Sequence, residues 1–221
     1  MTVAGRLEIV LNRSDASVRI RSSRPLGFAH MFEGRTPAEV VNLVPLVFNV
    51  CGMAQGVASV RACEKALGIE ASASTLCARD LLILAETARE HLLRVVMDWR
   101  RLIGLEADPL TARRVFDLDL RFRKVLSGPI LALGGADRPA GGSLDDLWSA
   151  IIGFRDLVDT IVFTEPAKSW LKRSRPIDLA AWFNAGSSPA QLMLQWVERE
   201  AATHAGEVPL NRLPIINDAR R

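Results

Sequence analysis

Cys51 is the residue of this 221-residue chain best placed for chemistry. It falls in the first turns of a helix expected soon after Pro45, where the helix macrodipole and free backbone N–H groups favour a thiolate. Gln55 lies one turn further along the same face, from which its amide can hydrogen-bond a ligand of a metal held by Cys51. A neutral amide is itself a poor ligand for a soft metal. From the residues alone, a buried, inert cysteine is favoured, with a one-thiolate metal site as the alternative.

The other cysteines and the histidines form no ligand set with Cys51 in the sequence. Cys63 follows Cys51 at a spacing of about 18 Å along one helix, so the two cannot share a metal within that helix. Cys77 could approach Cys51 only through tertiary packing, and we interpret both Cys63 and Cys77 as core residues. We interpret His91, which lies among leucines, as a hydrogen-bonded structural residue. The histidines lack the spacing of a metal site; they are His30, His91 and His204.

Composition is typical of a globular protein, since 49% of the residues are hydrophobic and 24% are charged. The net charge of +3 is too small to indicate nucleic-acid binding without a concentrated basic patch. A local cluster of basic residues near Trp170 is interpreted as a solvated face, with an acidic partner as the alternative. Its members are Lys168, Lys172, Arg173 and Arg175. The sequence contains no phosphate-binding loop and no nucleophile elbow, so we predict that the protein is not an enzyme.

Cysteine usage and the N-terminus indicate the compartment. Three cysteines without a CxxC pair do not make a disulfide framework, and they fit a reducing cytosol. The N-terminus lacks a basic region followed by an apolar run, so no signal peptide is expected. The uncharged segment Val40 to Val60 is long enough to span a bilayer, but Pro45 and several polar residues interrupt it. We interpret this segment as buried core and expect a cytoplasmic protein.

Local patterns in the first third of the chain predict a β-hairpin followed by two helices. Apolar and polar residues alternate in two runs over about residues 7–21, on either side of turn residues. Thr36 is expected to cap a helix that begins with a proline, and Pro45 should end or kink that helix. A second helix is expected from about Asn49 to Leu67, closed by Gly68.

The longest helix is predicted to begin after Ser72 or Ser74 and to extend to about Trp99. Apolar residues such as Leu84 and Leu92 occur around much of its circumference. This distribution predicts burial on more than one side.

The remaining segments are also expected to be helical. Residues 116–122 alternate like a strand and also pair at i,i+4, and we favour a helix because the neighbouring segments are helical. Capping signals at Ser143 and Ser188 predict two further helices, which reach about Phe163 and Gly206. The fold class is therefore mainly α with a small N-terminal β-hairpin, an α+β arrangement.

The run Pro45-Leu46-Val47-Phe48-Asn49-Val50-Cys51 resembles the metal-binding segment of [NiFe]-hydrogenase large subunits. That family has Pro-Arg-Ile-Cys-Gly-Val-Cys, followed by a histidine four residues after the second cysteine. Downstream, residues 59–62 and 66–69 are similar to the family's continuation without a gap. This register puts Cys51 on the second cysteine, Phe48 on the first and Gln55 on the histidine.

A second part of the resemblance precedes this run, and the match covers roughly residues 7 to 100. Gly27, Gly34 and Arg35 match the family's opening motif, whereas Ala29 replaces a glutamate that carries protons in the family. Nickel in the family needs four thiolates, two of them from a C-terminal Cys-x-x-Cys that this sequence lacks. The resemblance therefore implies neither nickel binding nor hydrogen turnover.

The surviving Cys51 corresponds to the cysteine that bridges towards iron in the family. This pattern resembles the HupK-type hydrogenase accessory proteins, which are degenerate relatives of the large subunit. The resemblance implies a maturation factor that carries the Fe(CN)2CO unit transiently on Cys51, with Gln55 beside the cofactor. It implies partners among the hydrogenase maturation proteins, such as a small HypC-type chaperone, or among the hydrogenase subunits. It also implies a bacterial cytoplasm.

Two other functions stay open at the level of the sequence. One is a metal-free interaction module that mimics the large subunit. The other is a degenerate electron-transfer or quinone-reactive subunit, for which the sequence offers no clear polar quinone-facing residues. We expect a single large-subunit-like domain over residues 1–221, with the hairpin at about 7–21 and a helical core at about 37–205. Large-subunit relatives are generally longer, which leaves open whether residues 1–221 are the complete chain.

Overall fold

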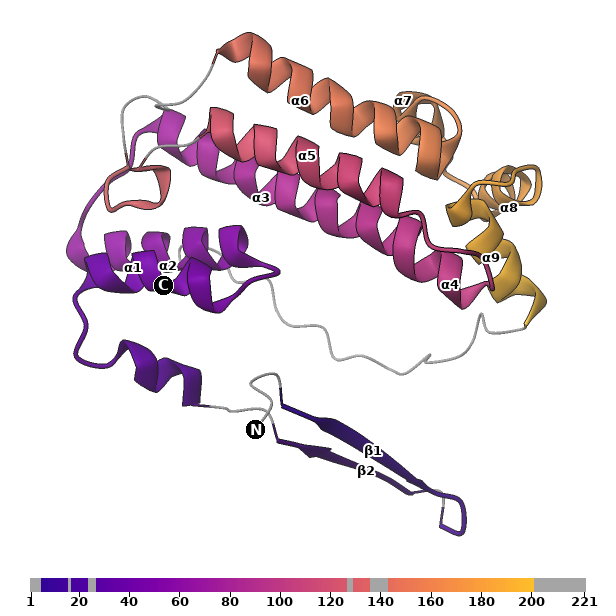
Figure 1. The fold of residues 1–221 in the computed structure, drawn as a ribbon, viewed down its shortest axis with the longest axis horizontal. Coiled ribbons are helices and arrows are strands. Elements are labelled where there is room, and N and C mark those ends of the chain that lie inside the picture. The colour runs from indigo at the N-terminus through magenta and orange to yellow at the C-terminus, as the bar shows by residue number, and fades with distance from the viewer. Residues whose placement is uncertain (1–4, 16, 24–26, 127–128, 136–142, 201–221) are drawn as a thin grey trace. The chain divides into compact units, whose positions relative to one another are not determined.

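A computed structural model describes residues 5–15, 17–23, 27–126, 129–135 and 143–200 of the chain. These residues are mainly helical, and two antiparallel strands form a small sheet, as the sequence predicted (Figure 1). Contacts divide the chain into two compact units, one of Met1–Ser72 with Leu131–Gly135 and one of Ala73–Ile130 with Ala136–Arg221. Each unit is described by itself below. The single domain expected over residues 1–221 stays a prediction.

The hairpin consists of β1 (Leu7–Asn12) and β2 (Ser17–Ser22). In its register Ile9 pairs with Ile20, so the side chains of these two residues share one face of the sheet. That face is aliphatic except for Ser22, and the opposite face carries mostly polar and charged side chains. The aliphatic face comprises Leu7, Ile9, Leu11, Val18 and Ile20, and each of them is more than half exposed.

The first unit continues with a short 3-10 helix, η1 (Gly27–Phe32), and with the helices α1 (Pro37–Val47) and α2 (Gly52–Leu67). The Thr36 hydroxyl accepts the Glu39 N–H at 3.3 Å, and the Glu39 carboxylate accepts the Thr36 N–H at 2.7 Å. This capping box sets the start of α1. The Thr36 backbone N–H, followed by its hydroxyl, holds the pKa of Glu39 below its usual value.

Both helix ends in this unit lie near their predicted positions. Pro45 lies in the last turn of α1, and the helix ends just past it at Val47. α2 begins at Gly52, three residues later than expected, and ends at Leu67, followed by the C-cap Gly68 in the left-handed conformation with φ of 66°. The buried Glu64 accepts the Gly134 N–H at 2.9 Å and thereby ties the segment Leu131–Gly135 to α2.

The second unit is built on three long helices. α3 (Ala73–Leu93) continues into the π-helical segment η2 (Arg94–Trp99) and the short α4 (Arg100–Leu102). α5 (Pro109–Val125) is capped by Asp108 and lies between α3 and α6 (Leu144–Leu157), as Figure 1 shows. The helix predicted over residues 116–122 is therefore confirmed. A capping box of Ser143 and Asp146 begins α6, which continues into a second π-helical segment, η4 (Val158–Phe163).

The prediction that α3 is buried on more than one side is wrong, since its buried residues follow one another at helical spacing along one face. Leu84 is 62% exposed, whereas Arg79 is fully buried and Arg89 is only 6% exposed. The Arg79 Nε–H donates to the Ile130 carbonyl at 2.7 Å. Arg89 donates to Asp119 of α5 at 2.8 Å, so the charge is buried with its partner. Charged side chains that are hydrogen-bonded or ion-paired thus occupy much of the face that packs on α5.

A third charged side chain completes this contact between α3 and α5. Arg123 Nε lies 3.0 Å from Asp119 Oδ2, outside hydrogen-bond geometry, so the contact is ionic. Burial acts to lower the pKa of Arg89, but the hydrogen bond and charge of Asp119 outweigh it, and the pKa is raised. Arg89 therefore stays charged in the folded protein.

The second unit ends with α7 (Ala167–Trp170), α8 (Pro176–Asn184) and α9 (Pro189–Arg199). The capping box predicted at Ser188 is present, but α9 ends at Arg199 rather than near Gly206. Two members of the basic cluster form ion pairs, Arg173 with Glu165 at 2.7 Å and Arg175 with Asp178 at 2.6 Å. A 3-10 turn, η3 (Pro129–Leu131), completes the helical elements of the described ranges. None of the helices in these ranges is long and apolar enough to cross a bilayer.

Candidate functional site

Cys51 lies at the start of α2, where the sequence placed it. It is the N-cap residue of the helix, with φ of −109° and ψ of 34°, and its thiol makes no capping hydrogen bond. The side chain is half-buried and the thiol is free of disulfides. The thiol therefore lies at the N-terminal end of the α2 dipole, which favours an anionic or electron-rich ligand.

Two glycines of α2 allow Pro45 to pack closely beside Cys51. A Cβ on Gly52 would lie 2.9 Å from the Pro45 carbonyl oxygen, and a Cβ on Gly56 would lie 2.9 Å from Pro45 Cγ. Both approaches are shorter than real Cβ contacts, so both positions need glycine. The last turn of α1 and the first turn of α2 are thereby locked together on either side of the loop that holds Cys51.

Gln55 lies one turn along α2 from Cys51, as predicted. Its backbone N–H donates to the Cys51 carbonyl at 2.9 Å, which is the first hydrogen bond of the helix. The Gln55 side chain is exposed, so its amide is available to a molecule bound at Cys51. Phe48, in the register position of the other cysteine, is half-buried at the C-terminus of α1 and offers no ligand atom.

The two other cysteines occupy α2 and α3. Cys63 is half-buried further along α2. Cys77 is exposed on α3, so the prediction that it is a core residue is wrong. In the described ranges, no three His, Cys, Asp or Glu side chains are grouped closely enough to hold a metal ion. Within the described ranges Cys51 thus offers a single thiolate to a metal.

Two of the three histidines, His30 and His91, lie in the described ranges. His30 Nδ1 is 2.6 Å from the Glu33 carboxylate, and both side chains are exposed. His91 is exposed and lines a hollow in the second unit, and its interpretation as a hydrogen-bonded structural residue stays a prediction. His204 lies outside the described residues.

Comparisons with known proteins connect this geometry to hydrogenases. Residues 26–115 match the family model of nickel-dependent hydrogenases, a range that contains Cys51 and Gln55. The hydrogenase expression/formation protein HupV of Azotobacter chroococcum is 35% identical over 108 residues, and HupK of Azotobacter vinelandii is 36% identical over 108 residues. The chain is a relative of the HupK-type hydrogenase expression/formation proteins.

The match to the HupK-type proteins covers only part of each chain. Each of these two alignments covers 47% of this chain and 32% of the relative, so the chain spans about a third of the length of the curated relatives it matches. Sulfhydrogenase 2 subunit alpha of Pyrococcus furiosus is 35% identical over 96 residues, which are 42% of this chain and 23% of that protein. No solved structure matches the chain. The likeness of the fold to the N-terminal part of the large subunit therefore stays a prediction.

The position of Cys51 could be predicted from the sequence, whereas the hollow in the second unit could not. Three of the five tryptophans, Trp99, Trp170 and Trp182, line it. They come from separate elements, and no spacing in the sequence brings them together. The high tryptophan content was the only local signal.

Proposed function

We propose that this chain is a hydrogenase assembly factor that holds the Fe(CN)2CO unit on Cys51 while the [NiFe] cofactor is built. The observation that carries the proposal is the position of Cys51, a free, half-buried thiol at the N-terminus of α2. The names of the relatives, hydrogenase expression/formation proteins, support a role in assembly rather than in turnover. The match of residues 26–115 to nickel-dependent hydrogenases supports a metal ligand within this segment.

A single protein thiolate suits a carrier. The Cys51 thiolate would donate one electron pair to iron, and release would break only that bond. Cyanide and carbon monoxide travel with the iron, so the cargo needs few protein ligands. The exposed Gln55 amide is positioned one turn away, where it can hydrogen-bond a cyanide nitrogen. A HypC-type chaperone or a hydrogenase subunit would supply any further thiolate, and a complete set of ligands from this chain would slow the transfer.

The test uses the full chain, co-expressed with the hydrogenase maturation proteins and purified without oxygen. Infrared bands of iron-bound cyanide and carbon monoxide are recorded together with the iron content. We expect both in the wild type and neither in Cys51→Ser. Cys77→Ser is the matched control, because that thiol is exposed and belongs to the second unit, and it should keep both signals. Equal iron and equal bands in Cys51→Ser and the wild type would refute the carrier proposal.

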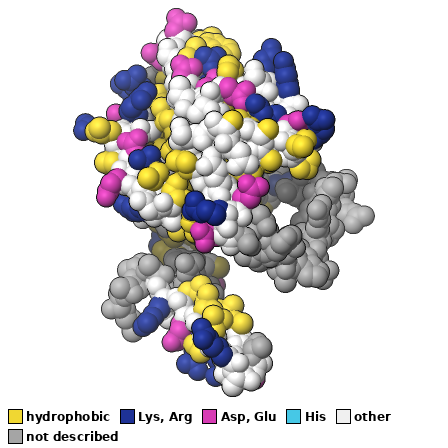
Figure 2. Space-filling model, turned by 90° about the vertical axis from the view of Figure 1, so that its right-hand side faces the viewer, with side chains coloured by type: hydrophobic (Ala, Val, Ile, Leu, Met, Phe, Trp, Pro, Cys, Tyr) yellow, Lys and Arg dark blue, Asp and Glu magenta, His cyan; other side chains and the backbone are white. Residues whose placement is uncertain are grey.

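A second candidate, the metal-free interaction module, is favoured by the hairpin. Its aliphatic face is unusually exposed, with Leu11 at 69% and Ile20 at 64%. Figure 2 shows hydrophobic side chains beside basic ones on the hairpin, at the bottom of the view. A two-stranded hairpin alone is marginally stable in water, and contiguous exposed apolar surfaces of this kind mark binding sites. The face would therefore be completed by an assembly partner.

Two substitutions in the hairpin separate the module from the carrier. Ile20→Thr removes apolar surface from the aliphatic face, whereas Val10→Thr makes a similar change on the opposite face. Both keep a β-branched residue, so strand propensity is preserved. If the chain is a module, Ile20→Thr lowers hydrogenase maturation in complemented cells while Cys51→Ser and Val10→Thr leave it unchanged. Loss with Cys51→Ser alone would favour the carrier. Normal hydrogenase maturation with all three variants would refute both the module and the carrier.

A further inference from the structure

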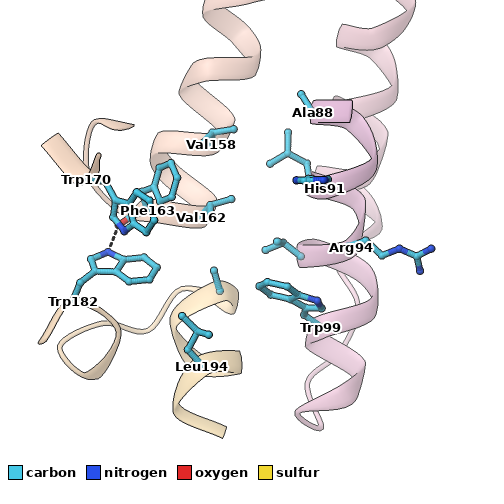
Figure 3. A pocket seen from close by; sticks show the side chains of 13 residues that line it. Ala88, His91, Arg94, Trp99, Val158, Val162, Phe163, Trp170, Trp182 and Leu194 are labelled. Carbon is cyan, nitrogen blue, oxygen red and sulfur yellow. Dashed lines mark hydrogen bonds between the residues drawn. The ribbon is translucent and has the colours of Figure 1, made fainter. Parts of the chain in front are cut away.

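The second unit contains an apolar hollow of about 560 Å³ between the end of α3, η4 and α9. Its walls are almost entirely aliphatic and aromatic side chains, and Figure 3 shows these side chains directed into the space between the helices. The volume is in the range of pockets that bind small molecules, about 300–1,000 Å³. The central lining residues are Val95, Trp99, Val162, Phe163, Trp182 and Leu194.

The aromatic wall of the hollow is held in place by ring contacts. Phe163 and Trp170 are stacked, with centroids 4.4 Å apart and an interplanar angle of 20°. Trp182 packs edge-on against both of them, at 6.3 Å from Phe163 and 5.5 Å from Trp170. Such arrangements use the favourable edge-to-face geometry of aromatic pairs, so the wall is formed before any ligand binds.

Hydrogen bonds to the end of η4 fix the same wall. The Trp182 Nε1–H donates to the Phe163 carbonyl at 2.9 Å, and the Ser188 hydroxyl donates to the Val162 carbonyl at 3.0 Å. The Gln191 amide in turn donates to the Trp182 carbonyl at 3.0 Å. The Trp182 and Ser188 side chains thus satisfy carbonyls at the end of η4, which lack helical partners there. Both π-helical segments of the second unit, η2 and η4, supply lining residues, and such segments occur frequently at functional sites.

Few polar groups reach the hollow. Figure 3 shows the His91 ring directed into it, whereas the Arg94 side chain points away and is paired with Asp98. The Trp170 Nε1 atom is buried and has no hydrogen-bond partner in the described part of the chain. His91 and Trp170 can each donate a hydrogen bond, and no lining residue offers an unpaired full charge of the kind that would hold an ionic ligand.

We propose that this hollow binds an uncharged, planar aromatic molecule of one or two fused rings that carries one hydrogen-bond acceptor. The rings would lie against the wall of Phe163, Trp170 and Trp182, and the acceptor would face His91. A charged ligand would lose its hydration in a space with almost no polar lining, so neutral molecules are favoured. This site is independent of Cys51 and of the proposed cargo.

The test uses prodan, an uncharged two-ring naphthalene with a ketone, and the full chain. Three of the chain's five tryptophans line the hollow, so binding should quench tryptophan emission and shift prodan emission to the blue. We expect one prodan per chain. The charged naphthalene anilinonaphthalene sulfonate should bind at least about tenfold more weakly. Comparable or tighter binding of the sulfonate would overturn the claim for neutral ligands.

Two pairs of variants locate the site. Ala88→Phe places a ring in the hollow and should weaken prodan binding by about tenfold or more, whereas Thr87→Phe adds the same ring at an exposed neighbouring position and should not. His91→Leu should weaken binding several-fold, and His91→Gln should restore it because the amide can donate. Prodan binding unchanged by Ala88→Phe would place the probe elsewhere and overturn the proposal. The proposal would also be overturned if the wild type bound no prodan while Ala88→Phe weakened association with a hydrogenase protein. That result would assign the hollow to a side chain of the partner.

Discussion

Replacing Gly56 with alanine tests the close packing that positions Cys51. The new Cβ would lie 2.9 Å from Pro45 Cγ and 3.2 Å from Leu131 Cδ1, against an optimal carbon–carbon separation of about 3.5–4.0 Å. Overpacking of this kind costs about 1–3 kcal/mol. Alanine in place of glycine inside a helix returns about 1 kcal/mol. We therefore expect the Gly56→Ala variant to be destabilised by about 1 kcal/mol, within a range from near zero to about 2 kcal/mol.

Hydrogen exchange of α2 amides measures this change locally. Tryptophan fluorescence does not report it, since all five tryptophans lie in the second unit. A loss of about 1 kcal/mol makes exchange from α2 about fivefold faster, while peptides of α9 serve as an internal reference. Ala62→Gly calibrates the helix-propensity contribution, because Ala62 is an exposed residue of the same helix.

Exchange in these two variants shows whether a Cβ at position 56 is overpacked against Pro45. If Gly56→Ala slows exchange by as much as Ala62→Gly accelerates it, only helix propensity has changed. The close approach to Pro45 would then be absent, and the account of how Cys51 is held between α1 and α2 would be wrong. Faster exchange in Gly56→Ala, despite its better helix propensity, supports that account.

Two further predictions concern the second unit. Arg89→Met leaves the Asp119 carboxylate buried beside Arg123 alone. We therefore expect the free energy of unfolding, measured in urea, to fall by up to about 3 kcal/mol. The double variant Arg89→Met/Asp119→Leu should recover most of this loss, because it also removes the buried carboxylate. The Thr111 backbone N–H, followed by its hydroxyl, lowers the pKa of Asp108, so this cap stabilises the fold above the ordinary aspartate pKa of about 3.9 and loses its effect as the pH falls through the lowered value. Asp108→Ala should therefore lower stability by about 1 kcal/mol at pH 7 and by much less near pH 2, and an equal difference at both pH values would contradict this reasoning.

Helix starts could be predicted from the sequence because capping is local. The capping boxes at Thr36, Ser143 and Ser188 each join residues three positions apart, and all three are present. The position of Cys51 followed from the same kind of signal, a proline before it and a glycine C-cap at the far end of its helix. The close packing of this helix against α1 is likewise reflected locally in the sequence, by Gly52 and Gly56, which lie one turn apart.

Burial could not be predicted where partners come from distant elements. Leu84 and Leu120 are exposed although they are apolar, and Arg89 and Asp119 are buried although they are charged. A hydrophobic pattern cannot show that these two charges neutralise each other across α3 and α5. The ends of helices were less predictable for the same reason, since α9 ends at Arg199 where no glycine marks it.

The buried ion pair and the apolar hollow are linked through α3. Ala88 and His91, which line the hollow, lie within one turn of Arg89, which is fixed by Asp119 on α5. Aliphatic contacts alone would allow α3 to slide or turn against α5, whereas a directional ion pair favours one register. The same register decides which residues of α3 face η4 and α9. The charged contact on one side of α3 therefore determines the shape of the uncharged hollow on the other, which explains why a helix that contributes to an apolar pocket retains buried arginine.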